Sequence, residues 1–311
     1  MRRRVRWSSV LVVAVVAVSS AACSGGGGGV DVSVRGEFGT LPDVSFPDGA
    51  PADSFAARTL VAGNGAAARK GDLVVADYVG YRWNGDGRTL LASSYAAGRP
   101  GAFPTGRLVP GLTRALVGAR PGSRVVARIP PEDGFGAGGD PKHRVGADDT
   151  LVYVLDVRAV YSSTAGPHGA AQAPLSEPGL PSVRDAGSGR APVVKVPRTA
   201  PPKSLRVRTL VRGDGAEVRE GQLLALHYAG LLWRDGKVFD SSWAAGQPSA
   251  VMIGTGQVVR GWDRGLVGQR VGSRVLLVVP PSLGYGSKGL ARFGIKGDDT
   301  LVFVVDLLGA H

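Results

Sequence analysis

Aromatic side chains beside glycines are the features of this sequence best suited to chemistry. Trp262 follows Gly261 where a short helix is expected to begin, and Tyr285 stands between two glycines in a loop. Rings in such places contact a ligand more often than they fill a core, because loops and element ends carry most binding residues. Phe303, within an apolar run, suits a core and a pocket equally. A cup of such rings binds an apolar group by burial.

The sequence lacks the residues that metal binding and nucleophilic catalysis need. The four histidines are dispersed, and the single cysteine is no partner to any of them. Two stretches formally match the dinucleotide-binding pattern G-x-G-x-x-G, but both follow Pro-Pro and do not open a helix. They are Gly134-Phe135-Gly136 with Gly139, and Gly284-Tyr285-Gly286 with Gly289. We therefore expect no cofactor and no metal.

The formal charge of +12 does not indicate a nucleic-acid interface. Four arginines belong to a removable leader, the other basic residues are scattered, and few aromatics lie among them. Attraction to an anionic membrane or cell-wall surface explains this charge better than a nucleic-acid interface does. An ordinary solvated surface without a partner explains it better than either. We expect no nucleic-acid partner.

Residues 1–22 have the layout of a secretory signal peptide. A basic start is followed by an apolar run and by small residues. The run of about nine residues is too short to span a bilayer. Ser20-Ala21-Ala22-Cys23 resembles the lipobox of bacterial lipoproteins, although Ser20 stands where Leu is commoner. The resemblance implies a lipid on Cys23, which would anchor the protein to the outer face of the bacterial cytoplasmic membrane. The alternative is an ordinary secreted protein with a free cysteine.

One domain occurs twice in this chain. Arg58-Thr59-Leu60-Val61 recurs as Arg208-Thr209-Leu210-Val211, and Asp148-Asp149-Thr150 recurs as Asp298-Asp299-Thr300, both at an offset of 150. Residues 161–202 contain eight prolines with Gly, Ala and Ser, which predicts a linker. Residues 23–54 have the same character and predict a lipid attachment site with a flexible tether. We place domain 1 at 55–160 and domain 2 at 203–311.

Short strands dominate each copy. In domain 2 the runs 223–228, 274–279 and 301–307 are rich in Val, Leu and aromatics and are bounded by Gly, Pro or Asp. The one convincing helix is short, at about 261–267. This pattern predicts an α+β fold in which an antiparallel sheet curls around one short helix.

Five motifs follow one another along domain 2. They are His227-Tyr228-Ala229-Gly230, Val238-Phe239-Asp240-Ser241-Ser242, Gln257-Val258-Val259-Arg260-Gly261-Trp262, Gly284-Tyr285-Gly286 and Thr300-Leu301-Val302-Phe303. In order and spacing they resemble the motifs of FKBP-type peptidyl-prolyl cis-trans isomerases. The resemblance implies two tandem FKBP-like domains, each with a half-open sheet around its helix and an aromatic pocket that receives a proline ring.

By that family's pattern, nine residues would form the pocket of domain 2. They are Tyr228, Phe239, Asp240, Val258, Val259, Trp262, Tyr285, Ile295 and Phe303. Trp262 would be the floor, the Tyr285 hydroxyl would bond a substrate carbonyl, and Asp240 would be a polar group held inside. The resemblance also implies proline-containing polypeptides as clients and macrolides as inhibitors.

Rotation about an X-Pro bond needs no nucleophile. The barrier is about 18–20 kcal/mol because amide resonance must be broken, and uncatalysed exchange takes about tens to hundreds of seconds. An aromatic cup that excludes water disfavours the polar planar amide relative to the twisted one. Each donor placed for the twisted form lowers the barrier further.

Domain 1 keeps the scaffold but loses pocket residues. At the nine positions it has Tyr78, Leu91, Ala92, Leu108, Val109, Leu112, Phe135, Val145 and Tyr153. Leu112 replaces the tryptophan, Ala92 replaces the aspartate, and Phe135 lacks the hydroxyl. We predict little or no isomerase activity in domain 1, and a role in substrate binding, spacing or chaperone-like capture.

The leading interpretation is therefore a prolyl isomerase that acts on exported proteins. The alternative is a chaperone or peptide-binding lipoprotein, in which both copies capture proline-containing or unfolded segments without catalysis. A solute-binding lipoprotein is a third candidate, although it usually needs a larger two-lobed body. Trp262 with Tyr285 favours the enzyme, and the degenerate domain 1 keeps the capture role open.

Overall fold

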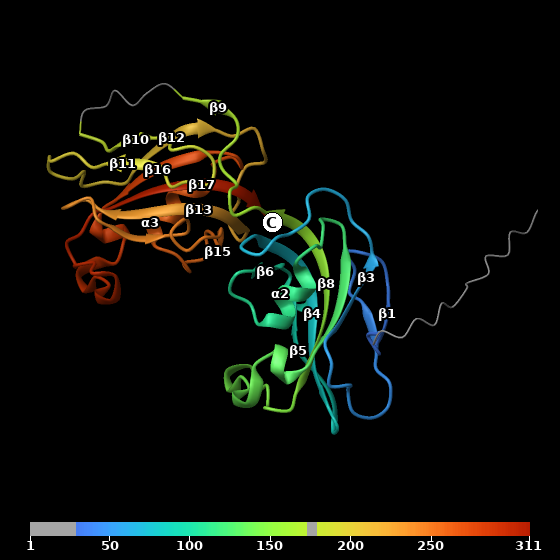
Figure 1. The fold of residues 1–311 in the computed structure, drawn as a ribbon. Coiled ribbons are helices and arrows are strands. Elements are labelled where there is room, and N and C mark those ends of the chain that lie inside the picture. The colour runs from blue at the N-terminus through green and yellow to red at the C-terminus, as the bar shows by residue number, and fades with distance from the viewer. Residues whose placement is uncertain (1–28, 173–178) are drawn as a thin grey trace, which may run out of the picture.

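Two antiparallel sheets form the framework of the protein. The computed structural model describes residues 29–172 and 179–311, so the expected signal peptide and Cys23 lie outside the described residues. Figure 1 shows the two sheets in separate bodies that meet near the C-terminus. Within the described ranges, no helix has the length and apolar character needed to cross a membrane.

Domain 1 contains six strands in the order β3-β7-β8-β4-β5, and β6 also pairs with β4. The strands are β3 (Ala56–Val61), β4 (Leu73–Asn84), β5 (Gly87–Ser93), β6 (Gly101–Pro104), β7 (Arg124–Ile129) and β8 (Thr150–Tyr161). The helices are α1 (Ser94–Ala97), α2 (Pro110–Leu116) and the 3-10 turns η1 (Pro131–Asp133), η2 (Gly136–Gly138) and η3 (Pro141–His143). The one-turn helix α1, capped by the Ser93 hydroxyl, is too short for sequence periodicity to predict.

Domain 2 repeats this plan with the strand order β14-β13-β17-β16-β12-β9, and β15 pairs with β13. The strands are β9 (Ala170–Ala171), β12 (Arg206–Arg212), β13 (Leu223–Leu232), β14 (Val238–Ser241), β15 (Ser249–Met252), β16 (Arg274–Val279) and β17 (Leu301–Ala310). The helices are α3 (Arg260–Leu266) and the 3-10 turns η4 (Pro281–Leu283), η5 (Gly286–Lys288) and η6 (Ala291–Phe293).

The predicted α+β fold is confirmed, with an antiparallel sheet around one seven-residue helix in each domain. The three strands predicted in domain 2 begin at Leu223, Arg274 and Leu301, as expected. Two of them run further than predicted, because β13 and β17 stay paired from Leu232 and Leu301 at one end to Leu224 and Ala310 at the other.

Both faces of the domain 2 sheet are buried. Phe303 and Val305 pack with Trp262 in the core around α3. Val302 and Val304, which point to the opposite face, belong to a second apolar cluster. Side chains alternate between faces along a strand, so a strand covered on both faces needs an unbroken apolar run.

A two-stranded hairpin covers the second face of each sheet. The hairpin strands are β1 (Ser33–Arg35) and β2 (Asp43–Ser45) before domain 1, and β10 (Ser182–Arg184) and β11 (Val193–Lys195) before domain 2. Val34, Val44 and Phe46 pack on the sheet of domain 1, and Val183 and Val194 pack on that of domain 2. This corrects the flexible tether expected within 23–54 and the linker expected within 161–202. Burial of these apolar side chains offsets the entropy lost when the segments become ordered.

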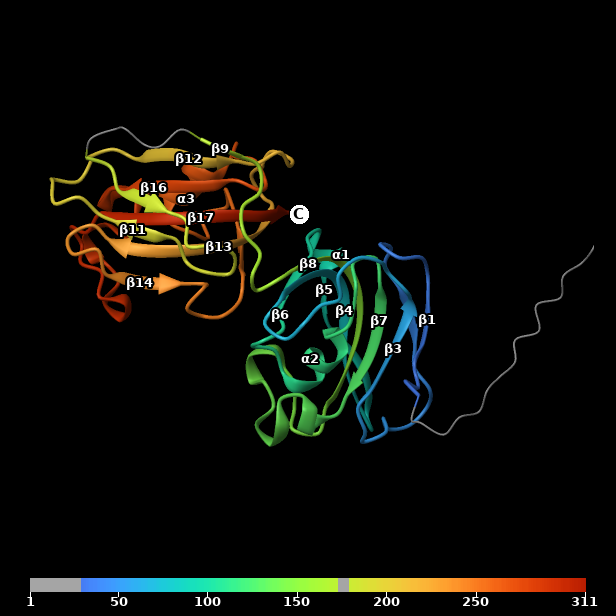
Figure 2. The same ribbon diagram turned by 45° about the horizontal axis from the view of Figure 1, so that its top comes forward.

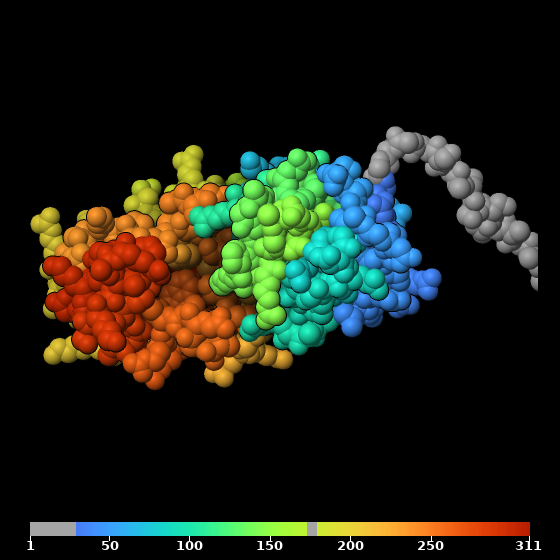
Figure 3. Space-filling model, turned by 90° about the horizontal axis from the view of Figure 1, so that it is seen from below, coloured from blue at the N-terminus to red at the C-terminus, as the bar shows by residue number. Residues whose placement is uncertain are grey.

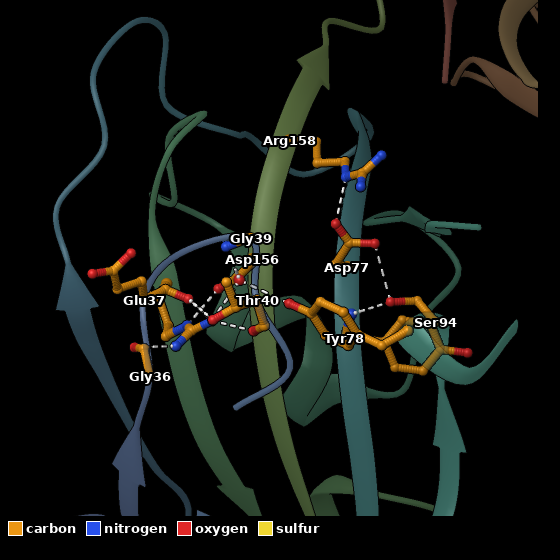
Figure 4. Close-up of polar contacts among 11 residues, drawn as sticks. Gly36, Glu37, Gly39, Thr40, Asp77, Tyr78, Ser94, Asp156 and Arg158 are labelled. Carbon is orange, nitrogen blue, oxygen red and sulfur yellow. Dashed lines mark hydrogen bonds and ion pairs between the residues drawn. The ribbon is translucent and has the colours of Figure 1, made fainter. Parts of the chain in front are cut away.

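A buried ion pair anchors the first hairpin (Figure 4). The Arg124 guanidinium, 1 % exposed, donates to both carboxylate oxygens of Asp156 at 2.6 and 2.7 Å. It also donates to the carbonyls of Gly36, Glu37 and Thr40, at 2.6, 2.7 and 2.9 Å. These bonds hold the hairpin turn against the end of the sheet, because a guanidinium presents its donors in a fixed planar fork.

Candidate active site

A cavity of about 650 Å³ opens between α3 and the sheet of domain 2. Eight of the nine residues predicted for the pocket line it: Tyr228, Phe239, Asp240, Val258, Val259, Trp262, Tyr285 and Phe303. Ile295 does not line the cavity, which corrects its assignment. Its side chain is buried in the core cluster that contains Trp262 and Phe303, so it supports the wall from behind.

Four aromatic rings form the base and one wall of this cavity. Trp262 contacts Tyr228 and Phe303 edge to face, each with ring centroids 5.3 Å apart. Phe303 meets Phe239 in the same manner at 5.8 Å. Edge-to-face contacts fix the rings relative to one another, because the positive edge of one ring meets the negative face of the next. The result is a preformed apolar cup.

Glycines at two positions let the rings approach so closely. A Cβ on Gly230 in β13 would lie 2.6 Å from the Phe239 ring and 2.9 Å from the Phe303 ring. A Cβ on Gly261 would lie 2.5 Å from Val279 in β16. Gly261 therefore allows the first turn of α3 to rest on the sheet, and the next residue, Trp262, becomes the floor of the cavity.

Asp240 sits inside the cavity as a hydrogen-bond acceptor. The Tyr228 hydroxyl donates to its Oδ2 at 2.5 Å. Burial raises the pKa of Tyr228 above its usual value, and the bond to Asp240 raises it further. Burial, followed by the charge of Asp240, also raises the pKa of Tyr285. Both phenols are therefore protonated donors at neutral pH.

Two donors at the cavity are left without a partner within the described residues. Trp262 Nε1 is the one buried side-chain N or O atom there that makes no hydrogen bond. No hydrogen bond from the Tyr285 hydroxyl is found in that part of the chain either, and the residue lines the cavity beside Gly284. A bound carbonyl would satisfy such a donor. No group of three or more His, Cys, Asp or Glu in the described ranges has the geometry of a metal site.

Sequence reasoning missed part of the rim. The remaining lining residues are Ser249, Ala250, Val251, Gln257, Arg260, Gly284, Leu290 and Arg292. Ser249 to Val251 belong to β15, a short edge strand without a distinctive pattern. Arg292 lies over the ring of Phe293 at 5.1 Å, and that ring contacts Phe239. Phe293 stands next to Gly294, and this pairing of an aromatic residue with a glycine was the sequence feature that could have indicated this part of the rim.

Domain 1 has a smaller cavity of about 380 Å³ at the equivalent place. All nine residues aligned with the pocket line it: Tyr78, Leu91, Ala92, Leu108, Val109, Leu112, Phe135, Val145 and Tyr153. Leu112 is smaller than a tryptophan, but Phe103 also lines this cavity and meets Tyr78 edge to face at 5.2 Å. In domain 2 the position of Phe103 in the sheet is held by Val251. Among the described residues Tyr78 has no carboxylate partner, because Ala92 stands where domain 2 has Asp240.

Comparison with known proteins agrees with this geometry. The family model described as FKBP-type peptidyl-prolyl cis-trans isomerase matches residues 65–158 and 215–308, which together exceed half of the chain. An FK506-binding protein of Streptomyces anulatus is 39% identical over 117 residues, covering 38% of this chain and 94% of that protein. Peptidyl-prolyl cis-trans isomerase FKBP2 of Homo sapiens is 50% identical over 90 residues, 29% of this chain and 62% of that protein.

The crystal structure of AtFKBP13 is 36% identical in sequence, with a TM-score of 0.33, over 36% of this chain and 96% of that one. The family match falls twice, once on each of the two sheets that surround a short helix and a cavity. This chain therefore belongs to the FKBP-type peptidyl-prolyl cis-trans isomerases and carries two domains of that family in tandem.

Proposed function

We propose that domain 2 catalyses the cis-trans isomerisation of X-Pro bonds and that domain 1 contributes little or no catalysis. The observation that supports this most is the aromatic cup of domain 2, with Trp262 as its floor and Asp240 held inside by Tyr228. In domain 1, Leu112 and Ala92 take the places of Trp262 and Asp240, so its cavity lacks the indole and has no carboxylate at the Asp240 position. The carboxylate that does line this cavity, Asp140, is paired with His143.

The cup favours rotation in two ways. A proline ring on Trp262 displaces water from the amide, and a planar amide loses more by this than the less polar twisted one. The Tyr285 hydroxyl faces the cavity as a donor that can bond a carbonyl of the bound segment, which holds that segment while the prolyl bond turns. No covalent bond between the substrate and the protein forms or breaks in this mechanism.

Exchange spectroscopy on a Leu-Pro peptide tests the assignment of catalysis to domain 2. Tyr285→Phe gives domain 2 the ring that domain 1 has at Phe135. We expect kcat/KM to fall about fivefold, the effect of one hydrogen bond to a neutral acceptor. Tyr153→Phe in the cavity of domain 1 is the matched control and should leave the rate unchanged. Equal losses in both variants would contradict the assignment.

Exported proteins are the proposed clients, and the outer face of the cytoplasmic membrane is the proposed location. The signal-like residues 1–22 and the lipobox-like stretch before Cys23 support this. Mass spectrometry of the protein from membranes should find a diacylglycerol on residue 23. The Cys23→Ser variant should move to the soluble extracellular fraction. Retention of the variant in the membrane would contradict the lipid anchor.

Macrolide inhibitors are proposed to bind the cavity of domain 2. Support comes from the similar Streptomyces anulatus protein, whose name is FK506-binding protein, and from the size and apolar lining of the cavity. FK506 should inhibit exchange in proportion to the domain 2 sites that it fills, as counted by calorimetry.

Capture without catalysis is the second candidate function, for domain 1 alone. Its cavity keeps an apolar lining but lacks the tryptophan. Chemical-shift changes in α2 on addition of a proline peptide, without accelerated exchange in the Trp262→Leu background, would support it.

A further inference from the structure

The two domains contact each other through the same surface of each repeat. Leu73 of domain 1 packs with Ala225 of domain 2, and Val75 packs with Leu223. At the repeat offset of 150, Leu73 corresponds to Leu223 and Val75 to Ala225. Exchanging the two repeats therefore converts each contact into the other, as the two-fold axis of a symmetric dimer interface does.

The C-terminus lies at the centre of this contact (Figures 1 and 2). The Tyr161 hydroxyl and His311 Nε2, which are equivalent positions of the two repeats, are 2.7 Å apart. Gly309 leaves room for the tyrosine, because a Cβ there would lie 1.7 Å from its hydroxyl. Burial raises the pKa of Tyr161 to about 12, so this hydroxyl is protonated at neutral pH.

Residues that differ between the repeats make the contact specific. In domain 1, Asp77 lies between Arg158 and Ser94 and bonds to both (Figure 4). In domain 2 the positions of Asp77 and Arg158 are held by His227 and Leu308. Leu308 joins the interdomain apolar cluster, and His227 Nε2 lies 3.2 Å from the carbonyl of Ser163, the second residue after β8. The pair of the exposed Arg158 and the buried Asp77 is thus replaced in domain 2 by residues that contact domain 1.

This contact brings a turn of domain 1 to the rim of the domain 2 cavity. Ala250 in β15 both lines that cavity and packs against domain 1. Beside it, the amide of Gly106 donates to Gln247 Oε1 at 3.2 Å. Figure 3 shows a recess between the orange and red residues of domain 2 and the green residues of domain 1.

Arg107 is the charged residue that this turn carries into the recess. Its exposed side chain lines the cavity of domain 1. Arg107 follows Gly106, whose amide bonds to Gln247, two residues before Ser249 in the lining of the domain 2 cavity. The positive charge of Arg107 also lowers the pKa of Tyr228, against the larger upward effects of burial and of Asp240. Within the described residues, the Arg107 side chain has no hydrogen bond or ion pair. It is free to bind a ligand.

The other charges at the domain 2 cavity have partners. Asp240, the one carboxylate in its lining, accepts the Tyr228 hydroxyl. The Arg260 guanidinium donates to the Ser282 carbonyl at 2.5 Å, and Arg292 lies over the Phe293 ring. The lining of the domain 2 cavity therefore holds two arginines and one carboxylate, and Arg107 stands on the adjacent turn of domain 1 with no such partner in the described residues.

We propose that Arg107 of domain 1 completes the substrate site of domain 2 and selects polypeptides that carry a carboxylate close to the proline. This rests on the proposed function and assigns domain 1 a part in it. The interdomain contact holds the Arg107 guanidinium of domain 1 beside the aromatic cup, which domain 2 supplies. Arg107 is a specificity residue here, since it touches the client and not the rotating bond.

The test compares peptides that differ in one charge, using the full chain. Leu-Pro peptides with Glu or Gln placed one or two residues to either side of the dipeptide are measured by exchange spectroscopy at low salt. We expect kcat/KM to favour one Glu peptide over its Gln twin by about three- to fivefold, the range of an exposed ion pair. Arg107→Gln should reduce this ratio to about one, and Arg107→Lys should keep most of it.

Two further variants decide between outcomes. Arg58→Gln removes one exposed charge from β3 and should leave the Glu/Gln ratio as in the wild type. Leu308→Gln keeps Arg107 but weakens the interdomain contact, and it should lower the ratio. An unchanged ratio in Arg107→Gln overturns the proposal. If no peptide is isomerised, the proposed catalysis fails, and the ratio of the two peptide dissociation constants from calorimetry still decides the role of Arg107.

Discussion

The hydrogen bond between Tyr228 and Asp240 allows a quantitative prediction for domain 2. The hydroxyl donates to Asp240 Oδ2 at 2.5 Å within the cavity, and a hydrogen bond to a charged group contributes about 1.5–3 kcal/mol. Tyr228→Phe removes the donor but keeps the ring and its contact with Trp262. We expect the free energy of unfolding of domain 2 to fall by about 1.5–2 kcal/mol, toward the low end because the site is half-buried.

Tyr78→Phe in domain 1 is the matched control. Its hydroxyl has no carboxylate partner in the part of the chain that the structure describes, because Ala92 takes the place of Asp240. We therefore expect a loss below about 0.5 kcal/mol. Native-state hydrogen exchange of amides in β13 and β4 reports the two domains separately, which a single unfolding curve of a two-domain chain does not.

A double-mutant cycle isolates the bond itself. Asp240→Ala and Tyr228→Phe are measured singly and together, and the coupling free energy should be about 1.5 kcal/mol or more. Coupling below about 0.5 kcal/mol would mean that water replaces the bond at no cost, which would refute the reasoning from burial.

Three further perturbations have expected outcomes. Arg124→Met leaves Asp156 buried without its charged partner and should lower the free energy of unfolding of domain 1 by about 3–5 kcal/mol, measured by native-state hydrogen exchange of β4 amides; a loss under about 1 kcal/mol would contradict the anchoring role. Gly261→Ala places a methyl group 2.5 Å from Val279, so domain 2 should lose about 1–3 kcal/mol and kcat/KM should fall; normal values for both would show that α3 has room to shift. Burial lowers the pKa of His227 from 6.5 to about 4, so its stabilising effect is complete above pH 6.5 and is lost as the pH falls toward 4. Acidification from pH 7 to 4.5 should therefore cost the wild type about 2 kcal/mol more than His227→Gln, and equal losses would contradict the burial of a neutral imidazole.

Local sequence patterns were sufficient for the central sheet and helix of domain 2. The apolar runs that begin at Leu223, Arg274 and Leu301 are bounded by turn residues, and the structure starts its strands there. The position of Trp262 after Gly261 also indicated the start of a helix against the sheet. These features depend on near neighbours in the chain, which is why a single sequence reveals them.

The hairpins before each domain were missed because their strands have only three residues each and lie among prolines and glycines. The sequence contained an indirect signal. The five residues from Val275 to Val279 are all apolar, and so is the run from Leu301 to Val305. Such strands need cover on both faces, and α3 can cover only one.

The interdomain contact and the position of Ile295 relative to the cavity could not be predicted from the sequence, for a different reason. Ile295 and Val145 are equivalent in sequence, but only Val145 lines a cavity. Both side chains are buried, so burial alone does not predict which of the two lines a cavity. Likewise, the exchange of Arg158 for Leu308 is visible in the repeat, but the surface that the leucine meets is not.

The rate of prolyl exchange in the Trp262→Leu variant tests the central claim most directly. The substitution gives domain 2 the residue that domain 1 has at Leu112 and leaves the sheet intact. With an X-Pro peptide and the full chain, we predict that the wild type accelerates exchange and that the variant loses most of this acceleration. Wild-type exchange no faster than that of the variant would contradict the claim that the aromatic cup of domain 2 is the catalytic site.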